Sequence, residues 1–567
     1  MTQPRFDRYF RFAELTDFLT DLQRRHDHLV KLESIGRSFQ GRHIWLCRVT
    51  DFASGDDTRK PAIWVDANIH SAELSGSTLC LLLLQKLVDG YGKDPVLTHC
   101  LQTRTFYICP RVNPDGAEWA LASVPKLVRS SVRPYPYPLD SPGPGLEQQD
   151  IDGDGRVLTM RIPDPNGAWK ICPSQPRLLI PREPTETEGR FYRLLPEGTI
   201  QDYDGVHIPL QAKKEQLDLN RNFPAQWREE FEQKGAGAYP TSEPEVRAIV
   251  DFIANHANIG AGIALHSYSG ALLRPYSYKP DHDMPGEDLW TYEKIGEYGS
   301  RMTGYPAVSA YHEFRYHPNE IITGALDDWL YDIRGVFGWT VEIWSPQRQA
   351  GIKDYKFIDW YRSHPLEDDI KLLAWSDSIL DGKGYVDWYP FEHPQLGPVE
   401  LGGWDSLFTF WNPPPALLEK EITPIAEWII WHVRILPRLE WHKIDIQALG
   451  ADCYRINAAV INVGWLPTYV TKNALKRNLS RGVIFEILLA PEATLEHGPR
   501  QIEVEQLEGR AYKRSSPCGF GGYVADPTDD RCAASWIVRC ASPADIEIVA
   551  RHDRAGYLSH RVQIGKR

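Results

Sequence analysis

Short apolar runs alternate with longer amphipathic stretches over the first 380 residues. Five apolar runs have the length and β-branched or aromatic content of strands, at residues 29–36, 43–51, 104–110, 259–267 and 337–344. Helical spacing of apolar residues marks residues 13–26 and 242–256. Elements that alternate in this way predict an α/β fold, with a mixed twisted sheet flanked by helices on both faces.

The expected helix at residues 242–256 carries a start signal. Ser242 is followed three residues later by Glu245. A serine and a glutamate at this spacing can each accept a hydrogen bond from the backbone of the other, as in a capping box. We therefore expect the helix to begin at Ser242.

The pattern changes twice along the chain. Between residues 117 and 216 proline, glycine and charged residues replace the periodicity, which indicates a long ordered insertion beside the site or, as the alternative, a flexible linker. After about residue 440 short alternating runs separated by turns predict an all-β sandwich. The expected division is a catalytic domain at residues 1–440, including the insertion, and a β-sandwich domain at residues 441–567.

Composition and charge narrow the class of protein. The chain of 567 residues is 42% hydrophobic, which is typical of a folded globular protein of more than one domain. Its net charge of −13 opposes non-specific binding to nucleic acid or to an anionic membrane. No apolar run approaches the roughly 20 residues that span a bilayer. Nine cysteines without a repeated spacing and no evident secretory signal favour the cytoplasm, unless a leader has been lost.

Two histidines lie where apolar strands end. His70 and Glu73 follow the run at residues 61–65, and His266 closes the run at residues 259–267. A catalytic zinc ion takes three protein ligands and keeps a fourth position for water, so these three residues are a candidate set. Either histidine alone would more often be structural than a ligand, because the chain has 18.

Five motifs occur in a fixed order: HSAE, NPDG, DLNRNF, HSYSG and TVEIW, at residues 70–73, 113–116, 218–223, 266–270 and 340–344. In this order they resemble the site of the zinc metallocarboxypeptidases of the carboxypeptidase A and B type. The resemblance implies that His70, Glu73 and His266 bind Zn²⁺. It also implies that Asp218 orients a ligand histidine and that Glu342 is the general base.

The same resemblance implies a peptide substrate with a free C-terminal carboxylate. Asn220 and Arg221 match the pair that holds this carboxylate, a task that suits a planar guanidinium. A second arginine is needed to polarise the scissile carbonyl. Arg129 and Arg133 are both candidates, and we prefer Arg129.

The stretch GALDDWLYD resembles a motif of the carboxypeptidase B branch in which an aspartate faces the terminal side chain of the substrate. By this resemblance Asp327 favours a basic terminal residue such as Lys, Arg or the amino end of diaminopimelate. The alternative is a turn residue whose carboxylate hydrogen-bonds a backbone amide.

Two positions depart from the family. Where the digestive enzymes have a mobile tyrosine over the substrate, this chain has Glu320, and Tyr316 or Tyr311 is the candidate replacement. The family motif HSRE carries an arginine where this chain has Ala72. Contacts to the upstream part of the substrate are therefore expected to differ.

The insertion contains a second candidate metal site. Asp150, Asp152 and Asp154 alternate and are followed by Gly155, as in the first half of a calcium loop. The glutamate that usually ends such a loop is missing, and Asp164 is the candidate substitute. The alternative to Ca²⁺ is an Asp-Gly turn that hydrogen-bonds itself.

These observations predict a zinc metallocarboxypeptidase that hydrolyses the C-terminal peptide bond. One alternative is a cell-wall or muropeptide peptidase with the same zinc machinery. A second is a catalytically silent peptide-binding relative, although such a relative would be free to lose the ligands, the base and the Asn-Arg pair.

Overall fold

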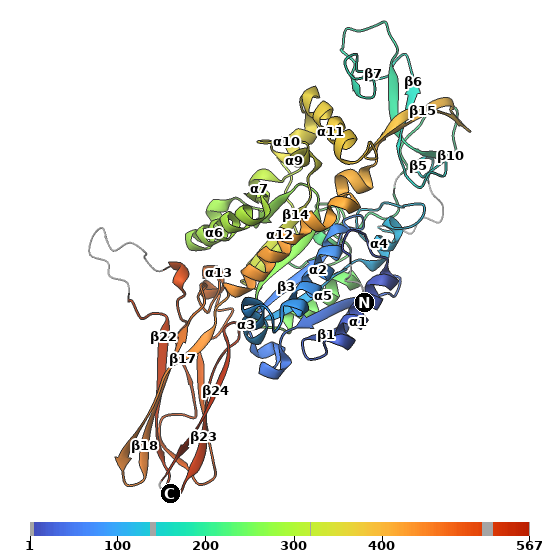
Figure 1. Cartoon of the computed structure of the whole chain (residues 1–567). Helices are drawn as coiled ribbons and strands as arrows, with labels where there is room; N and C mark the ends of the chain where they lie inside the picture. The colour runs from blue at the N-terminus through green and yellow to red at the C-terminus, as the bar shows by residue number, and fades with distance from the viewer. Residues whose placement is uncertain (1–4, 136–142, 212, 318, 513–525, 566–567) are drawn as a thin grey trace.

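The computed structural model describes residues 5–135, 143–211, 213–317, 319–512 and 526–565. Its centre is an eight-stranded sheet in the order β1-β2-β4-β3-β11-β14-β12-β13 (Figure 1). The strands are β1 (Val30–Arg37), β2 (His43–Val49), β3 (Ala62–Ala67), β4 (Thr105–Cys109), β11 (Ile259–Ser267), β12 (Ala271–Arg274), β13 (Ala307–Ser309) and β14 (Phe337–Ile343). The predicted mixed α/β fold is confirmed.

The middle of this sheet is parallel and fully buried. Strands β4, β3, β11 and β14 lie side by side and run in the same direction. Every residue of these four strands is buried. A parallel sheet needs helices on both faces, so its strands read as continuous apolar runs rather than alternating ones.

Helices cover both faces of the sheet. On one face α2 (Ser75–Gly90), α6 (Gly286–Thr303) and α12 (Pro415–Arg434) share a large apolar core with the strands. On the other face α5 (Pro244–Ala254) packs on β1, and α8 (Leu326–Asp332) packs on β11 and β14. Helix α1 (Phe12–Arg25) packs beside β1 at the sheet edge.

The expected capping box is wrong. Helix α5 begins at Pro244, and its N-cap is Glu243. The hydroxyl of Ser242 donates to the Glu243 carboxylate instead of accepting from the helix. The carboxylate of Glu245 accepts from the backbone amide of Phe39, because a distant loop competes for it.

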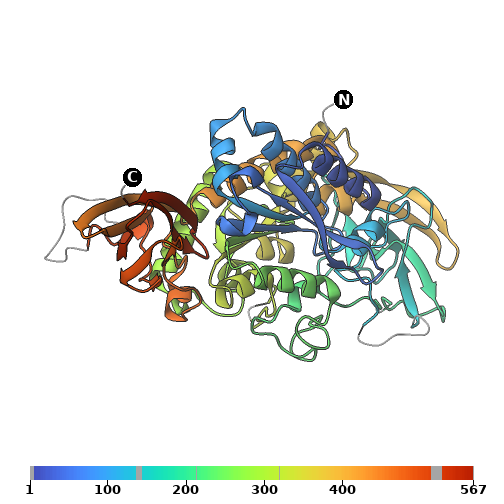
Figure 2. The same ribbon diagram turned by 90° about the horizontal axis from the view of Figure 1, so that it is seen from below.

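The insertion is a folded layer and not a linker. It supplies β5 (Gly145–Gln148), β6 (Thr159–Pro163), β7 (Trp169–Ile171), β8 (Leu179–Pro181), β9 (Tyr192–Pro196) and β10 (Gly198–Gln201). Four of them continue a hairpin of β15 (Tyr385–His393) and β16 (Gly397–Trp404) into a six-stranded sheet. The hairpin lies some 200 residues later in the chain, which explains why local periodicity misses these short strands. Figure 2 shows this layer at one end of the molecule.

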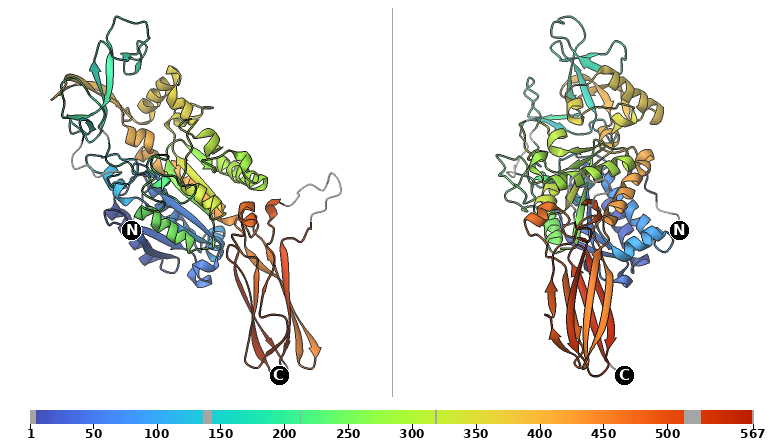
Figure 3. Two further views of the ribbon diagram at one scale, coloured as in Figure 1. Left: turned by 180° about the vertical axis from the view of Figure 1, so that it is seen from behind. Right: turned by 90° about the vertical axis from the view of Figure 1, so that its left-hand side faces the viewer.

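Two four-stranded antiparallel sheets form the C-terminal part, at the opposite end of the molecule (Figure 3). One sheet contains β17 (Leu439–Gly450), β18 (Cys453–Asn462), β22 (Arg531–Arg539) and β20 (Thr494–His497). The other contains β21 (Gln501–Glu503), β19 (Ile484–Leu489), β23 (Ala544–His552) and β24 (Gly556–Ile564). Apolar residues from both sheets share one core, as in a sandwich. We propose the domain boundary at residue 440.

The C-terminal part holds the end of α8. The side-chain amide of Asn473 donates to the carbonyl of Tyr331 at 2.8 Å. The hydroxyl of Thr471 and the guanidinium of Arg554 both donate to the carbonyl of Gly335 at 2.9 Å. Gly335 has a φ of +63°, and a Cβ there would lie 2.6 Å from Ala474, so glycine is required at this contact.

Within the described ranges no helix is long and apolar enough to cross a membrane. The eight cysteines in the described part of the chain are free thiols, and six of them are buried.

Helix α12 generates a prediction about acid stability. His432 is fully buried, and neither ring nitrogen has a hydrogen-bond partner. Burial lowers its pKa from 6.5 to about 3. The unfolded chain therefore binds a proton between these pKa values that the folded chain does not, so stability falls as the pH falls below 6.5. We expect His432 to cost about 2 kcal/mol of unfolding free energy at pH 5 relative to pH 7.5.

Urea unfolding of wild type and His432→Leu at pH 5 and pH 7.5 measures this difference in unfolding free energy. The variant should lose less stability on acidification, whereas His282→Leu, with a side chain 80% exposed, should behave as wild type. The same pH dependence in wild type and His432→Leu would show that the buried imidazole is not its source.

Candidate metal centre and cleft

Three adjacent parallel strands deliver polar side chains to one edge of the sheet. His70 follows β3, His266 lies near the end of β11, and Glu342 lies opposite His266 in the register of β11 and β14. All three side chains are buried. The carboxyl ends of parallel strands are where open α/β sheets form their sites, because the sheet fixes side chains that the loops then surround.

His70, Glu73 and His266 converge on one point. Nδ1 of His70 lies 2.8 Å from Oε1 of Glu73, and Nδ1 of His266 lies 3.1 Å from both Nδ1 of His70 and Oε2 of Glu73. Oε2 of Glu73 is buried and accepts no hydrogen bond with acceptable geometry. Tetrahedral zinc at ordinary bond lengths separates its ligand atoms by about 3.3 Å, so this donor set fits Zn²⁺.

Two asparagines hold the loop that carries His70 and Glu73. The amide of Asn68 donates to the carbonyl of His70 at 2.7 Å. The side chain of Asn412 accepts from the backbone amides of Leu74 and Ser75 and donates to the carbonyl of Ala72. The loop is thus fixed from both sides before any ion binds.

Asp218 links the histidine to an arginine. Its Oδ1 lies 3.0 Å from Nε2 of His70, and its Oδ2 accepts from Nε of Arg129 at 3.0 Å. Burial would raise the pKa of Asp218, but the charges of Arg129 and Arg221 outweigh it and hold the pKa well below its usual range. A carboxylate that stays ionised in this position fixes the orientation of His70.

The two candidate arginines lie in different places. Arg129 reaches Asp218 and lies 3.6 Å from Glu73, so it stands at the centre. Arg133 pairs instead with Glu243 at 2.6 Å. Of the two, the geometry leaves only Arg129 beside the candidate metal ligands.

Asn220 and Arg221 are buried next to this centre. Oδ1 of Asn220 accepts from the backbone amide of Leu326, which leaves its amide NH₂ as the free end. Arg221 donates to the carbonyl of Asn220 at 2.8 Å and lines the main cavity. Of the two, Arg221 lines the cavity, and Asn220 lies directly beside it.

Glu342 is buried, and within the described residues no donor reaches its carboxylate. Burial raises its pKa well above 4.5, and the negative charge of Glu73 adds to the rise. A carboxylate without a hydrogen-bond partner beside a candidate metal is free to take up a proton.

Asp327 lies deeper than the cavity wall. Its side chain is 4% exposed and accepts from the backbone amide of Asp328 and from the hydroxyl of Thr340. Burial raises its pKa. The amide contact matches the turn alternative, while its charge also acts on the pKa of Glu342, so both interpretations of Asp327 stay open.

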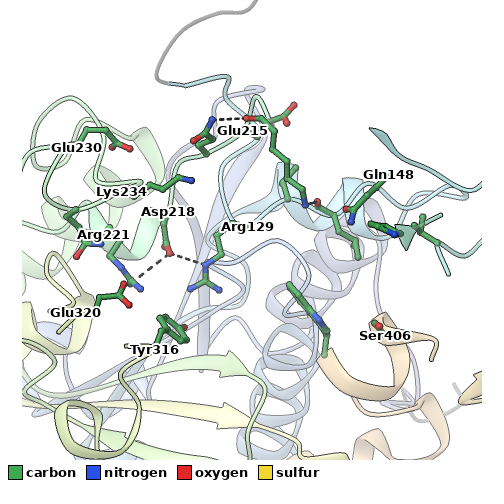
Figure 4. Close-up of a pocket in the computed structure, with 18 of the residues that line it drawn as sticks. Arg129, Gln148, Glu215, Asp218, Arg221, Glu230, Lys234, Tyr316, Glu320 and Ser406 are labelled. Atoms are coloured by element: carbon green, nitrogen blue, oxygen red, sulfur yellow. Dashed lines mark hydrogen bonds and ion pairs between the residues drawn. The ribbon is translucent and has the colours of Figure 1, made fainter. Parts of the chain in front are cut away.

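A cavity of about 1500 Å³ is lined by Asp218, Arg129 and Arg221, and the first two of these contact the candidate metal ligands. Figure 4 shows Arg129 and Asp218 in its middle, Arg221, Glu320, Glu230 and Lys234 towards one side, and Gln148 and Ser406 towards the other. Tyr316 lines the cavity below Arg129, whereas the ring of Tyr311 lies against Arg315. Of the two tyrosines, Tyr316 lines this cavity and Tyr311 does not, and the role of Tyr316 over the substrate stays a prediction.

The acidic cluster of the insertion differs from the predicted one. Carboxylates of Asp150, Asp152 and Glu197 lie within 4.8 Å of one another. Asp154 pairs with Arg156, and Asp164 pairs with Arg193 at 2.8 Å. Asp154 and Asp164 pair with arginines and are not part of this group, so the predicted set of four aspartates is not brought together, and calcium binding stays a prediction.

Backbone amides also occupy the remaining carboxylates of this cluster. Asp150 accepts from the amides of Gly153 and Gly155, and Glu197 accepts from those of Ile151 and Leu158. These are the hydrogen bonds of the self-bonded Asp-Gly turn. Glu197 could not be found from the sequence, since it lies between β9 and β10, more than 40 residues after Asp152.

Comparison with known proteins gives two family matches. The model described as zinc carboxypeptidase matches residues 15–134 and 197–361, and a model described as a domain of unknown function matches residues 438–563. Pig carboxypeptidase A1 is 26% identical over 57% of this chain and 59% of its own length. Rat carboxypeptidase B2 is 25% identical over 62% of this chain and 67% of its own length. The matched region thus spans less than two thirds of the pig protein.

The contact between Asp218 and His70 generates a prediction about zinc binding. Asp218→Asn should weaken Zn²⁺ binding about 10- to 100-fold, because the neutral amide no longer orients the imidazole or raises its basicity. Competition with a fluorescent chelator measures the dissociation constant without any assay of activity. Asp164→Asn, which removes a carboxylate bound only to the surface Arg193 and a nearby backbone amide, is the matched control. Equal affinities in Asp218→Asn and wild type would place the metal elsewhere.

Proposed function

This chain belongs to the zinc carboxypeptidase family, and from that premise we propose that it is a zinc-dependent metallocarboxypeptidase that hydrolyses the C-terminal amide bond of peptides. The observation that carries the proposal is the convergence of His70, Glu73 and His266 near the buried carboxylate of Glu342, to which no hydrogen bond is made within the described residues. A silent binder has no need of a buried, unpartnered carboxylate, which costs free energy.

Zinc held by His70, Glu73 and His266 would supply a Lewis acid and lower the pKa of a water molecule. The chain supplies the proton transfers. Glu342 takes a proton from the attacking water and passes it to the nitrogen of the departing residue, so the carboxylate ends the cycle as it began. Its isolation from other donors keeps it available for this exchange.

Arg129 stabilises the negative charge that develops on the oxygen of the scissile carbonyl. Its Nε is held by Asp218, so its terminal nitrogens remain for the substrate. Such a fixed donor stabilises the transition state without reorganisation. Arg221 and the amide of Asn220 bind the terminal carboxylate, and Tyr316 covers the substrate from the opposite side of the cleft.

Removal of the proposed base Glu342 should remove activity, and the pH dependence of wild-type activity should report the pKa of Glu342. Glu342→Gln should lower kcat about 10³-fold, because the amide cannot accept the proton of the attacking water. In wild type the activity should rise with pH through the pKa of Glu342, so the acid limb of kcat/KM should lie above pH 4.5. Hydrolysis of blocked dipeptides by zinc-loaded protein across pH 4–9 measures both.

A chelated sample and Glu297→Gln, an exposed carboxylate on α6, are the controls for this experiment. A Glu342→Gln protein as fast as wild type would refute the assigned mechanism. An acid limb well below pH 4.5 would show that Glu342 is not the titrating base.

We propose in addition that Asp327 gives a preference for basic terminal residues. A carboxylate buried below Glu342 can attract a cationic side chain into the pocket, at the cost of its desolvation. Asp327→Ala should reduce the ratio of kcat/KM for Lys-ending over Leu-ending peptides about 10-fold or more. An unchanged ratio would leave Asp327 as the hydrogen-bonded turn residue. Asp327→Asn keeps the hydrogen bonds without the charge and separates the two roles.

A further inference from the structure

The cleft continues well beyond the candidate metal centre. The terminal carboxylate of the proposed substrate lies at Arg221, so the rest of the peptide must run across Arg129 towards the far side (Figure 4). That side is formed by the insertion strands and by residues 404–411. Residues 404–411 lie outside both family matches, which end at residue 361 and resume at residue 438.

Residues 404–412 occupy the neighbourhood of Ala72. Ala72 is fully buried in an apolar cluster with Leu407, and Phe408 and Trp411 pack against this cluster. Asn412 fixes the segment by its hydrogen bonds to the loop of the metal ligands. An apolar segment therefore stands beside the position where the resembling enzymes have an arginine.

Trp411 presents an aromatic face to the cleft. It is partly buried, it lines the main cavity, and its ring centroid lies 6.2 Å from that of Tyr268 with an interplanar angle of 32°. Tyr268 is held in turn by edge-to-face contacts with Phe357, Tyr361 and Phe410. Tyr268, which does not itself line the cavity, is thus held by its neighbours and packs against Trp411.

Apolar side chains accompany Trp411 in this cavity. Leu127 packs on the same apolar cluster as Trp411. Val128, Leu158 and Trp404 also line the cavity, together with the polar Gln148 and Ser406. The apolar side chains can stabilise a bound aromatic or aliphatic group through removal of apolar area from water, and aromatic pairs add to this.

We propose that Trp411, supported by Tyr268, forms a substrate subsite that selects a large apolar or aromatic side chain upstream of the scissile bond. The inference rests on the proposed carboxypeptidase function and deepens it. It assigns a specificity-determining residue to a segment that the family matches do not cover. Upstream recognition then depends on side-chain contact and not on an arginine.

Three acetylated peptides that share a terminal lysine test the subsite: Gly-Gly-Lys, Gly-Phe-Lys and Phe-Gly-Lys. Wild type should hydrolyse one of the two phenylalanine peptides with a kcat/KM about 10-fold above that of Gly-Gly-Lys, and which one identifies the position seated on Trp411. Trp411→Ala should abolish this ratio, mainly through KM, while Trp411→Phe should retain it within about threefold.

The kcat/KM for Gly-Gly-Lys corrects for differences between variants in folding and in the metal centre, because this peptide has no side chain to place at the subsite. Trp290→Ala removes a partly exposed tryptophan stacked on Trp465 and should keep the wild-type ratio. A ratio near one in wild type, or an undiminished ratio in Trp411→Ala, would overturn the inference.

Failure of the proposed function is distinguishable from failure of the subsite. If zinc-loaded protein hydrolyses none of the peptides, the carboxypeptidase proposal fails. Calorimetry then gives the dissociation constants of the same three peptides. The ratio of the constant for Gly-Gly-Lys to that for each phenylalanine peptide tests the subsite by binding alone. Tighter binding of a phenylalanine peptide that is lost in Trp411→Ala supports the subsite, and equal binding overturns it.

Discussion

The structure depends on one electrostatic constraint, the burial of two imidazoles and two carboxylates around a point at the end of three strands. The candidate ligand atoms of His70, Glu73 and His266 stand 2.8–3.1 Å apart, and Glu342, buried near them, receives no hydrogen bond from the described residues. Burial of these imidazoles and carboxylates in an apolar sheet costs free energy unless a cation or a proton balances the negative charge. The hydrogen bonds of Asn68 and Asn412 hold the loop in place despite the repulsion between the buried carboxylates. The ion pair between Asp218 and Arg129 adds a positive charge next to this group.

The sheet supplies the rigidity that this arrangement needs. Strands β3, β11 and β14 are buried on both faces, so their side chains cannot relax without loss of packing. The site forms only where the strands end and the apolar pattern stops. The same geometry separates the proposed roles. The proposed ligands lie on the loop after β3 and on β11, the proposed base lies on β14, and the proposed donors for the substrate lie on the segment around Asn220. Each group therefore acts from its own anchored element.

The sequence predicts much of this arrangement because the relevant signals are local. Apolar runs identify the buried strands, and His70, Glu73, His266 and Glu342 stand at their ends. What the sequence could not predict depends on pairing between distant segments. Glu243 takes Arg133 away from the centre, Phe39 takes the carboxylate of Glu245, and the strands of the insertion complete a sheet with a hairpin far along the chain. Likewise nothing local indicates that Trp411 faces the cleft, since its position follows from how Asn412 binds the loop near Ala72.

The hydrogen bonds from the C-terminal part to the end of α8 and the turn after it have an evolutionary consequence. Asn473 binds the carbonyl of Tyr331 in the helix that carries Asp327, and Thr471 and Arg554 bind that of Gly335 just after it, so the proposed terminal-residue pocket and the β-domain share a set of contacts. Sequence change on one side of this contact must be matched on the other. A lineage that exchanged its C-terminal domain by recombination would inherit a pocket helix with unbound ends. The two parts are therefore expected to be transmitted together, as a single heritable unit.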